Sequence, residues 1–140
     1  MGAAALIVDA GPLIAYVEPT DRHHAECLEL LETYPGPLVV PVLVIAEVAH
    51  LIQSARGPEP EIRFLGDLAS GAFSIEPARA SDWMRIAELV ARYHDLPLGT
   101  VDASVVAAAE RLGVVEIATL DRRDFGAVRP AHADAFVLLP

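Results

Sequence analysis

Residues 6–12 constrain the fold of this chain more than any other stretch. Leu6, Ile7 and Val8 form a short apolar run that stops at Asp9, and Gly11-Pro12 follows almost at once. Branched apolar residues favour a strand, whereas Gly-Pro does not extend one. The pattern therefore predicts a buried strand with Asp9 at its carboxyl end, which is the end where ligands bind in a parallel α/β sheet.

The rest of the chain alternates between strand and helix patterns. Further strands are expected at 38–40, 73–75, 115–119 and 136–139, the last at an edge, and helices at 13–17, 22–34, 42–56, 61–68, about 81–93 and 100–112. Thr20 or Asp21 is expected to cap the second helix, Ser81 or Asp82 the fifth, and Gly113 to end the sixth. This alternation predicts one α/β domain over residues 1–140, with a mostly parallel twisted sheet and helices on both faces.

The composition of the chain indicates its cellular compartment. Cys27 is the only cysteine, so no internal disulfide can form, and a reducing compartment is favoured. No basic segment precedes the first apolar run, which is too short for a signal peptide. The longest apolar stretch, 37–52, is interrupted by Pro41, Glu47 and His50 and does not suit a membrane span. We therefore expect a cytoplasmic protein.

The charge pattern excludes several classes of protein. The formal net charge is -10, and all ten basic residues are arginine. Such a surface repels nucleic acid, so RNA binding would need a bound metal, local arginines or a basic partner. Receiver domains and haloacid-dehalogenase-type phosphatases place a lysine beside their aspartates, and this chain has none. It also has no glycine-rich nucleotide-binding loop.

Four acids are the candidate site residues: Asp9, Glu47, Asp102 and Asp121, with Asp124 as the alternative to Asp121. Each also has an ordinary explanation. Asp9 could be a turn residue, Glu47 a partly exposed acid at a helix boundary, and Asp102 a first-turn acid that complements the helix dipole. Asp121 and Asp124 could belong to a surface loop with local ion pairs.

Taken together, the acids point to one site. Two of them follow strands, and two lie near helix starts on inward or boundary faces, positions that converge at one edge of an α/β sheet. Several carboxylates in contact cannot all stay ionised without a cation. Oxygen ligands suit Mg²⁺ or Mn²⁺, and a metal that activates water beside a phosphodiester is nuclease chemistry.

Four segments carry a resemblance to a known family. Residues 7–15 resemble the opening of a PIN domain, 42–48 its second motif with a helical glutamate, 98–103 its third and 118–125 its fourth. The motifs occur in the family's order over nearly the whole chain, which implies a PIN-like three-layer sandwich. The short single-domain form is most similar to VapC toxins of VapBC toxin–antitoxin systems.

The resemblance implies an Mg²⁺- or Mn²⁺-dependent endoribonuclease, a homodimer and a cognate VapB-like antitoxin. Carried over by position, Asp9, Glu47 and Asp102 would be metal ligands, Asp121 the fourth acid, and Thr119 a nearby helper. The chain departs from many members at Gly11, where they have Ser or Asn, so that hydroxyl or amide contact is missing.

The sequence also predicts two binding surfaces. Arg122 and Arg123 are candidates for contact with RNA phosphates, although ion pairs with Asp124 would also explain them. The helices at 22–34 and 42–56 should offer an apolar groove to a basic amphipathic helix of the antitoxin. A PIN nuclease outside any toxin–antitoxin pair, or a PIN-like binding module without turnover, would also fit the sequence.

Overall fold

The structure, a computed structural model, describes residues 4–140, which form a single parallel sheet and seven helices. The strands are β1 (Leu6–Val8), β2 (Leu38–Pro41), β3 (Ser74–Glu76), β4 (Glu116–Ala118) and β5 (Val137–Leu139). The helices are α1 (Ala10–Val17), α2 (His24–Thr33), α3 (Val42–Arg56), α4 (Pro58–Ala69), α5 (Ala80–Arg92), α6 (Thr100–Leu112) and α7 (Arg122–Ala127).

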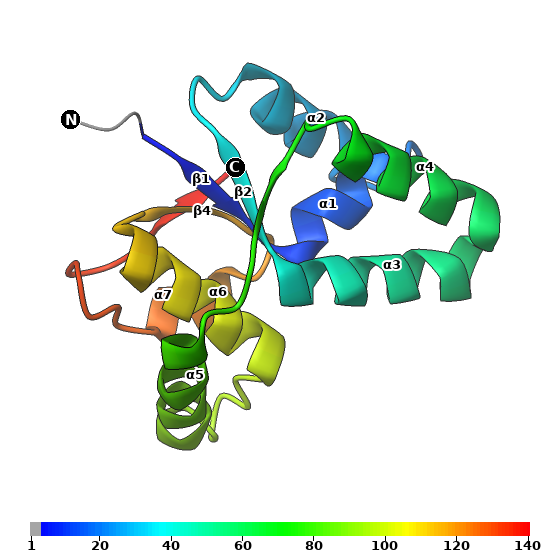
Figure 1. Cartoon of the computed structure of the whole chain (residues 1–140). Coiled ribbons are helices and arrows are strands. Elements are labelled where there is room, and N and C mark those ends of the chain that lie inside the picture. The colour runs from blue at the N-terminus through cyan, green and yellow to red at the C-terminus, as the bar shows by residue number, and fades with distance from the viewer. Residues whose placement is uncertain (1–3) are drawn as a thin grey trace.

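The strand order is β3-β2-β1-β4-β5, and every neighbouring pair is parallel. The chain builds outward from β1 through β2 to β3, then crosses back to add β4 and β5 on the other side of β1. Figure 1 shows α1–α4 gathered on one side of the sheet and α5, α6 and α7 on the other. The order reverses between β1 and β4, and such a switch point leaves a crevice at the carboxyl ends of the strands.

Buried aliphatic residues explain why these elements form the core. All three residues of β1 are fully buried, as expected for the central strand of a sheet covered on both faces. Helix α6 is buried from Ala103 to Ala109, and its small side chains allow α5 and the sheet to approach closely. Gly113 ends α6 with a φ of 70°, a left-handed conformation that glycine adopts without strain.

Most elements match the sequence expectations, and the differences concern helix starts and one short helix. The expected α/β fold, the bounds of α3 and α6, and the edge position of β5 are confirmed. Helix α7 was not expected. The Gly113 cap is confirmed, but the predicted N-caps were wrong: His23 and Arg79 stand at the N-cap positions of α2 and α5. No helix of residues 4–140 has the length and apolarity needed to cross a membrane.

A buried ion pair holds α6 against α5. Asp82 lies in the first turn of α5, is 6% exposed, and accepts the backbone N–H of Arg79 at 2.9 Å. Arg111, in the last turn of α6, donates to both Asp82 carboxylate oxygens at 3.0 Å and to Glu76 at 2.8 Å. Burial alone would raise the pKa of Asp82, but these hydrogen bonds outweigh it and the pKa is lowered.

We expect Arg111→Met to lower the free energy of unfolding by about 2–3 kcal/mol, because it leaves the Asp82 carboxylate buried without its partner. Urea denaturation at pH 7 measures the loss. Arg22→Ala, which also removes one exposed arginine, should change stability by no more than about 0.5 kcal/mol. Equal stability of the two variants would show that the Asp82–Arg111 pair does not hold α6.

Candidate metal and active site

The site lies at the crevice where the strand order reverses. Asp9 directly follows β1, is 6% exposed, and its backbone N–H donates to the carbonyl of Ala118 at the end of β4 at 2.9 Å. This bond fixes the first acid against the strand that leads to Thr119 and Asp121. The parallel pairing of β1 and β4 therefore explains how residues more than a hundred positions apart meet.

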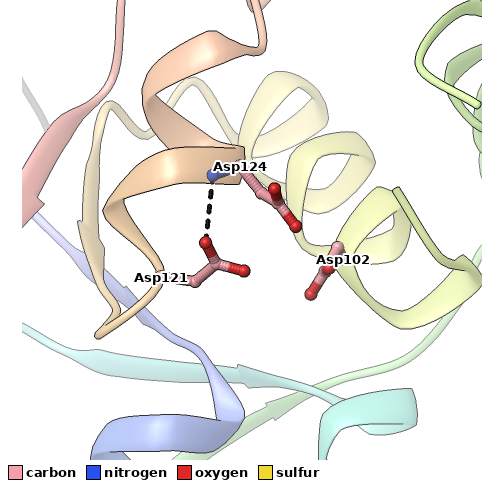
Figure 2. Close-up of side chains that lie close together, drawn as sticks. All are labelled: Asp102, Asp121 and Asp124. Atoms are coloured by element: carbon pink, nitrogen blue, oxygen red, sulfur yellow. Dashed lines mark hydrogen bonds between the residues drawn. The ribbon is translucent and has the colours of Figure 1, made fainter. Parts of the chain in front are cut away.

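Three aspartates from α6 and α7 point toward one another. Asp102 lies in the first turn of α6, Asp121 is the N-cap of α7, and Asp124 lies in the first turn of α7. One carboxylate oxygen from each lies within 4.8 Å of the other two, which is close enough to share one ion. Figure 2 shows the three side chains facing a common space between the two helices. The structure thus brings together both residues that the sequence left as alternatives, Asp121 and Asp124.

A chain of hydrogen bonds orients these acids. The buried Thr119 hydroxyl donates to Asp9 Oδ2 at 2.9 Å and accepts the backbone N–H of Asp121 at 3.0 Å. Asp121 Oδ1 in turn accepts the backbone N–H of Asp124 at 3.0 Å, which caps α7. An acid followed three residues later by another at a helix start is a capping pattern, and it is the local signal of α7 that the sequence offers.

Crowding of like charges changes the protonation of the site. Burial, together with the charges of Asp9, Asp121, Asp124 and Glu47, raises the pKa of Asp102 to about 7. Burial also raises the pKa of Asp9, despite hydrogen bonds from the Ala10 N–H and Thr119. The pKa of Asp124 is raised by burial and by Asp121, against the opposing effect of Arg123.

Glu47 stands on α3. It is half-buried, and its charge contributes to the raised pKa of both Asp9 and Asp102, so it lies within electrostatic range of the cluster. Its oxygens do not belong to the group of three that lie within 4.8 Å of one another. Glu47 therefore borders the site from the α3 side.

The two arginines beside the acids differ in their surroundings. Arg122 donates from its guanidinium to the carbonyl oxygen of Pro140, which ties α7 to the residue after β5. Arg123 is exposed and lowers the pKa of Asp124 through its charge. Among residues 4–140, no arginine forms an ion pair with Asp9, Asp102, Asp121 or Asp124.

Gly11 has a packing role next to the site. A Cβ at this position would lie 3.3 Å from Leu120 Cβ, tighter than ordinary van der Waals contact. Leu120 stands between Thr119 and Asp121, so a side chain at position 11 would press on the segment that carries the hydrogen-bond chain. This contact explains why glycine suits position 11, although many members of the family that the sequence resembles have Ser or Asn there.

The donor set suits a hard divalent cation. Only carboxylate oxygens converge in the three-residue group, and oxygen ligands are those that Mg²⁺ and Mn²⁺ prefer. No protein cation in residues 4–140 neutralises the group by an ion pair, and the pKa of Asp102 is raised by burial and by the uncompensated neighbouring charges. A bound divalent ion would relieve it.

Comparison with known proteins identifies the family. The family model described as PIN domain matches residues 6–129, so the chain belongs to the PIN-domain family. It is 33% identical over 135 residues to Ribonuclease VapC26 of Mycobacterium tuberculosis (strain ATCC 25618 / H37Rv), an alignment that covers 96% of this chain and 100% of that protein. Within the family, the chain is therefore of the VapC type.

Two solved structures share the fold. The crystal structure of Mycobacterium tuberculosis VapC20, a Sarcin-Ricin loop cleaving toxin, superposes with a TM-score of 0.82 at 19% identity and covers 92% of this chain and 98% of that one. A toxin-antitoxin complex from Klebsiella pneumoniae gives a TM-score of 0.67 at 21% identity and covers 96% of this chain and 100% of the matched one. The PIN-like fold expected from the sequence is confirmed.

Asp102→Asn should stabilise the metal-free protein at alkaline pH. The folded pKa of about 7 exceeds the ordinary value of 3.8, so the stability linked to the neutral Asp102 carboxyl is present below about pH 4 and is lost as the pH rises through 7. At pH 8 we expect the variant to gain about 1–2 kcal/mol, since water at this half-buried site screens much of the repulsion.

Urea denaturation in EDTA at pH 5 and pH 8 measures this effect. Asp95→Asn is the matched control, because its side chain is 94% exposed and the charge change is the same. A gain in stability that appears equally in both variants, or that is larger at pH 5, would contradict the raised pKa of Asp102.

Proposed function

We propose that this chain is a cytoplasmic endoribonuclease that acts as the toxin of a type II toxin–antitoxin pair and hydrolyses RNA phosphodiester bonds with Mg²⁺ or Mn²⁺. The observation that carries the proposal is the meeting of Asp102, Asp121 and Asp124 near Asp9 at the switch point of the sheet. The names of the relatives, a VapC ribonuclease and an RNA-cleaving toxin, support the same chemistry.

Five acids would share the work of holding the ion. Asp9, Glu47, Asp102 and Asp121 are the proposed ligands, and Asp124 completes the group through its contact with Asp121. When bound, a divalent ion in such a site activates a water and stabilises the leaving oxygen of a phosphodiester. The acids themselves orient that ion from β1, α3, α6 and α7, so the position of each element fixes one ligand.

Thr119 would act through the acids rather than on the substrate. Its hydroxyl is committed to Asp9 as a donor and to the Asp121 N–H as an acceptor. This double contact fixes which Asp9 oxygen remains available to a metal. Side chains that orient ligands in this way typically contribute 10- to 100-fold to metal affinity or activity.

An antitoxin would cover the apolar surface near α1–α4. A groove of about 420 Å³ lies between α1, α2 and α4, and its lining includes Tyr16, Leu28 and Pro60. Leu51 on α3 and Ile62 and Leu65 on α4 are 43%, 64% and 46% exposed. The exposed apolar surface thus extends over α4 as well as over the helices expected from the sequence. The toxin-antitoxin complex among the similar folds supports this partner.

A homodimer is part of the proposal. Trp83 and Met84 on α5 are 49% and 73% exposed. Helix α5 lies on the other side of the molecule from α1–α4 (Figure 1). Large apolar side chains in contact with water favour association with another surface. A homodimer that covers Trp83 and Met84, in the first half of α5, would leave the groove free for the antitoxin.

The central test is RNA cleavage by the purified chain. With Mn²⁺ or Mg²⁺ we expect total RNA to be cut at discrete positions, which sequencing of the new ends reveals. Asp9→Asn and Glu47→Gln should each lower the rate by at least about 100-fold, because each removes a charged ligand. Glu59→Gln, which neutralises an exposed acid of α4, should cleave normally.

The possible results separate the candidate functions. Cleavage that persists in EDTA, or that Asp9→Asn leaves intact, would refute the metal-dependent mechanism. RNA binding without cleavage under any of these conditions would favour a PIN-like binding module.

Association with a basic antitoxin should slow as salt rises. The formal net charge of -10 attracts a cationic partner over long range, and salt screens that attraction. The apolar contact near α4 should keep dissociation slow at every salt concentration. Stopped-flow mixing at roughly 50 mM to 500 mM NaCl measures both rates, because the electrostatic screening length shortens over this range. An association rate independent of salt would remove the electrostatic part of the proposal.

A further inference from the structure

We propose that Arg92, Tyr93, Arg129 and Arg123 form a surface that binds the RNA backbone beside the acidic site. The inference rests on the proposed ribonuclease function and names the part of the molecule that holds its substrate. An enzyme with a net charge of -10 repels RNA over most of its surface, so it needs local cations where the strand must lie. These four residues are called the cationic rim below.

The arginines of this chain fall into two groups. In the first, each guanidinium is already engaged: Arg56 with Glu18 at 2.9 Å, Arg79 with Glu76 at 4.0 Å, Arg85 with Glu110 at 2.7 Å, Arg111 with Asp82 at 3.0 Å, and Arg122 with the Pro140 carbonyl. The second group contains five arginines: Arg92, Arg123 and Arg129, which lie on segments that flank the acids, and Arg22 and Arg63, which lie near α2 and on α4. They are exposed and form no ion pair within 4.0 Å among residues 4–140.

Tyr93 connects two members of the rim. Its hydroxyl accepts the backbone N–H of Arg129 at 3.0 Å, which joins the end of α5 to the segment after α7. The Arg92 guanidinium lies 5.8 Å from the centre of the Tyr93 ring. An arginine over an aromatic ring presents both a cation and a flat surface, the combination with which proteins bind single-stranded nucleic acid.

The rim lies next to the acids because the same segments carry both. The Tyr93 carbonyl accepts the N–H groups of Leu96 and Leu98 at 3.0 and 3.2 Å, and this turn leads directly into α6 and Asp102. Arg129 follows Asp124 by five residues. The first three of these steps lie within α7, and the last two lie after it. The two Cα atoms are therefore at most about 12 Å apart. An RNA strand whose scissile phosphate lies at the acids would place its neighbouring phosphates within reach of these arginines.

The charge of the rim favours RNA over the antitoxin as its occupant. The groove proposed for the basic antitoxin holds one unpaired arginine, Arg63, together with the acid Asp67. The rim has three unpaired arginines, so a basic segment meets more repulsion there. Guanidinium groups instead bind phosphate oxygens, often in a bidentate manner. The apolar surface offered to the antitoxin lies over α1–α4, on the other side of the sheet from α5 and α7 (Figure 1).

Anisotropy of a fluorescein-labelled, mixed-sequence 12-nucleotide single-stranded RNA tests the inference. The full chain is used in an Asp9→Asn background, so that the RNA stays intact. We expect Arg92→Ala and Arg129→Ala each to weaken binding by about tenfold and to reduce the slope of log K against log salt by about 0.7. Arg22→Ala removes one exposed arginine and the same net charge from the start of α2 and should leave affinity and slope unchanged.

Tyr93→Phe is the second variant, since it keeps the ring under Arg92 and loses only the hydroxyl that holds the Arg129 N–H. It should weaken RNA binding by about twofold to threefold, through the loss of one hydrogen bond, with an unchanged thermal midpoint. Circular dichroism melts of all four variants show whether any loss of affinity comes from unfolding.

The outcomes distinguish this inference from the proposed function. If Arg92→Ala and Arg129→Ala match Arg22→Ala in RNA affinity while the wild type cleaves RNA, the rim is wrong and the nuclease stands. If the rim variants lose RNA binding but the wild type never cleaves, the rim stands and the nuclease fails. No measurable binding of the 12-nucleotide RNA, or a loss of antitoxin binding alone, overturns the inference.

Discussion

Mutual repulsion among carboxylates is the interaction on which the rest of this structure depends. Asp102 faces four other acids, and burial together with their charges raises its pKa to about 7. Such a cluster persists only if stronger local interactions hold each member in place. The backbone of β1 and β4 and the hydroxyl of Thr119 provide that restraint for Asp9 and Asp121, and the α7 cap provides it for Asp124.

Asp102 is held differently, by a helix rather than by hydrogen bonds at the site. Helix α6 is buried along most of its length, and Arg111 fixes its far end to Asp82 and Glu76. The two ends of α6 thus differ in their electrostatics. Asp102 at the start has no cationic partner among residues 4–140, whereas Arg111 at the end is paired with Asp82 and Glu76. Stability gained at the paired end offsets the repulsion at the start, which is how a metal-free fold can tolerate the site.

The sequence was sufficient for the fold because its signals are local. A run of three buried aliphatic residues before Asp9, proline and glycine at element ends, and helical periodicity in α3 and α6 do not depend on distant residues. The convergence of Asp9 with Asp121 was also predictable, because both follow strands and parallel strands end at one edge. Helix α7 was missed because six residues show too little periodicity to separate a helix from a loop.

The sequence does not show which distant side chains pair with one another. Nothing local distinguishes Arg122, which contacts Pro140, from Arg123, which remains exposed beside Asp124. Tyr93 likewise meets Arg129 only because the end of α5 lies against the segment after α7. Such choices depend on tertiary packing and must be read from the structure.

The distribution of arginines follows from the same electrostatic constraint. With twenty acids and ten arginines, an arginine near a carboxylate usually pairs with it, and most of the engaged arginines do. The acidic cluster is the place where pairing would defeat the proposed function, because an arginine bound to Asp102 or Asp121 would compete with a metal ion. The neighbouring arginines are instead directed to a carbonyl, to an aromatic ring or to solvent. Cations kept near the acids but out of contact with them leave the carboxylates available to a metal and the guanidinium groups available to a phosphate.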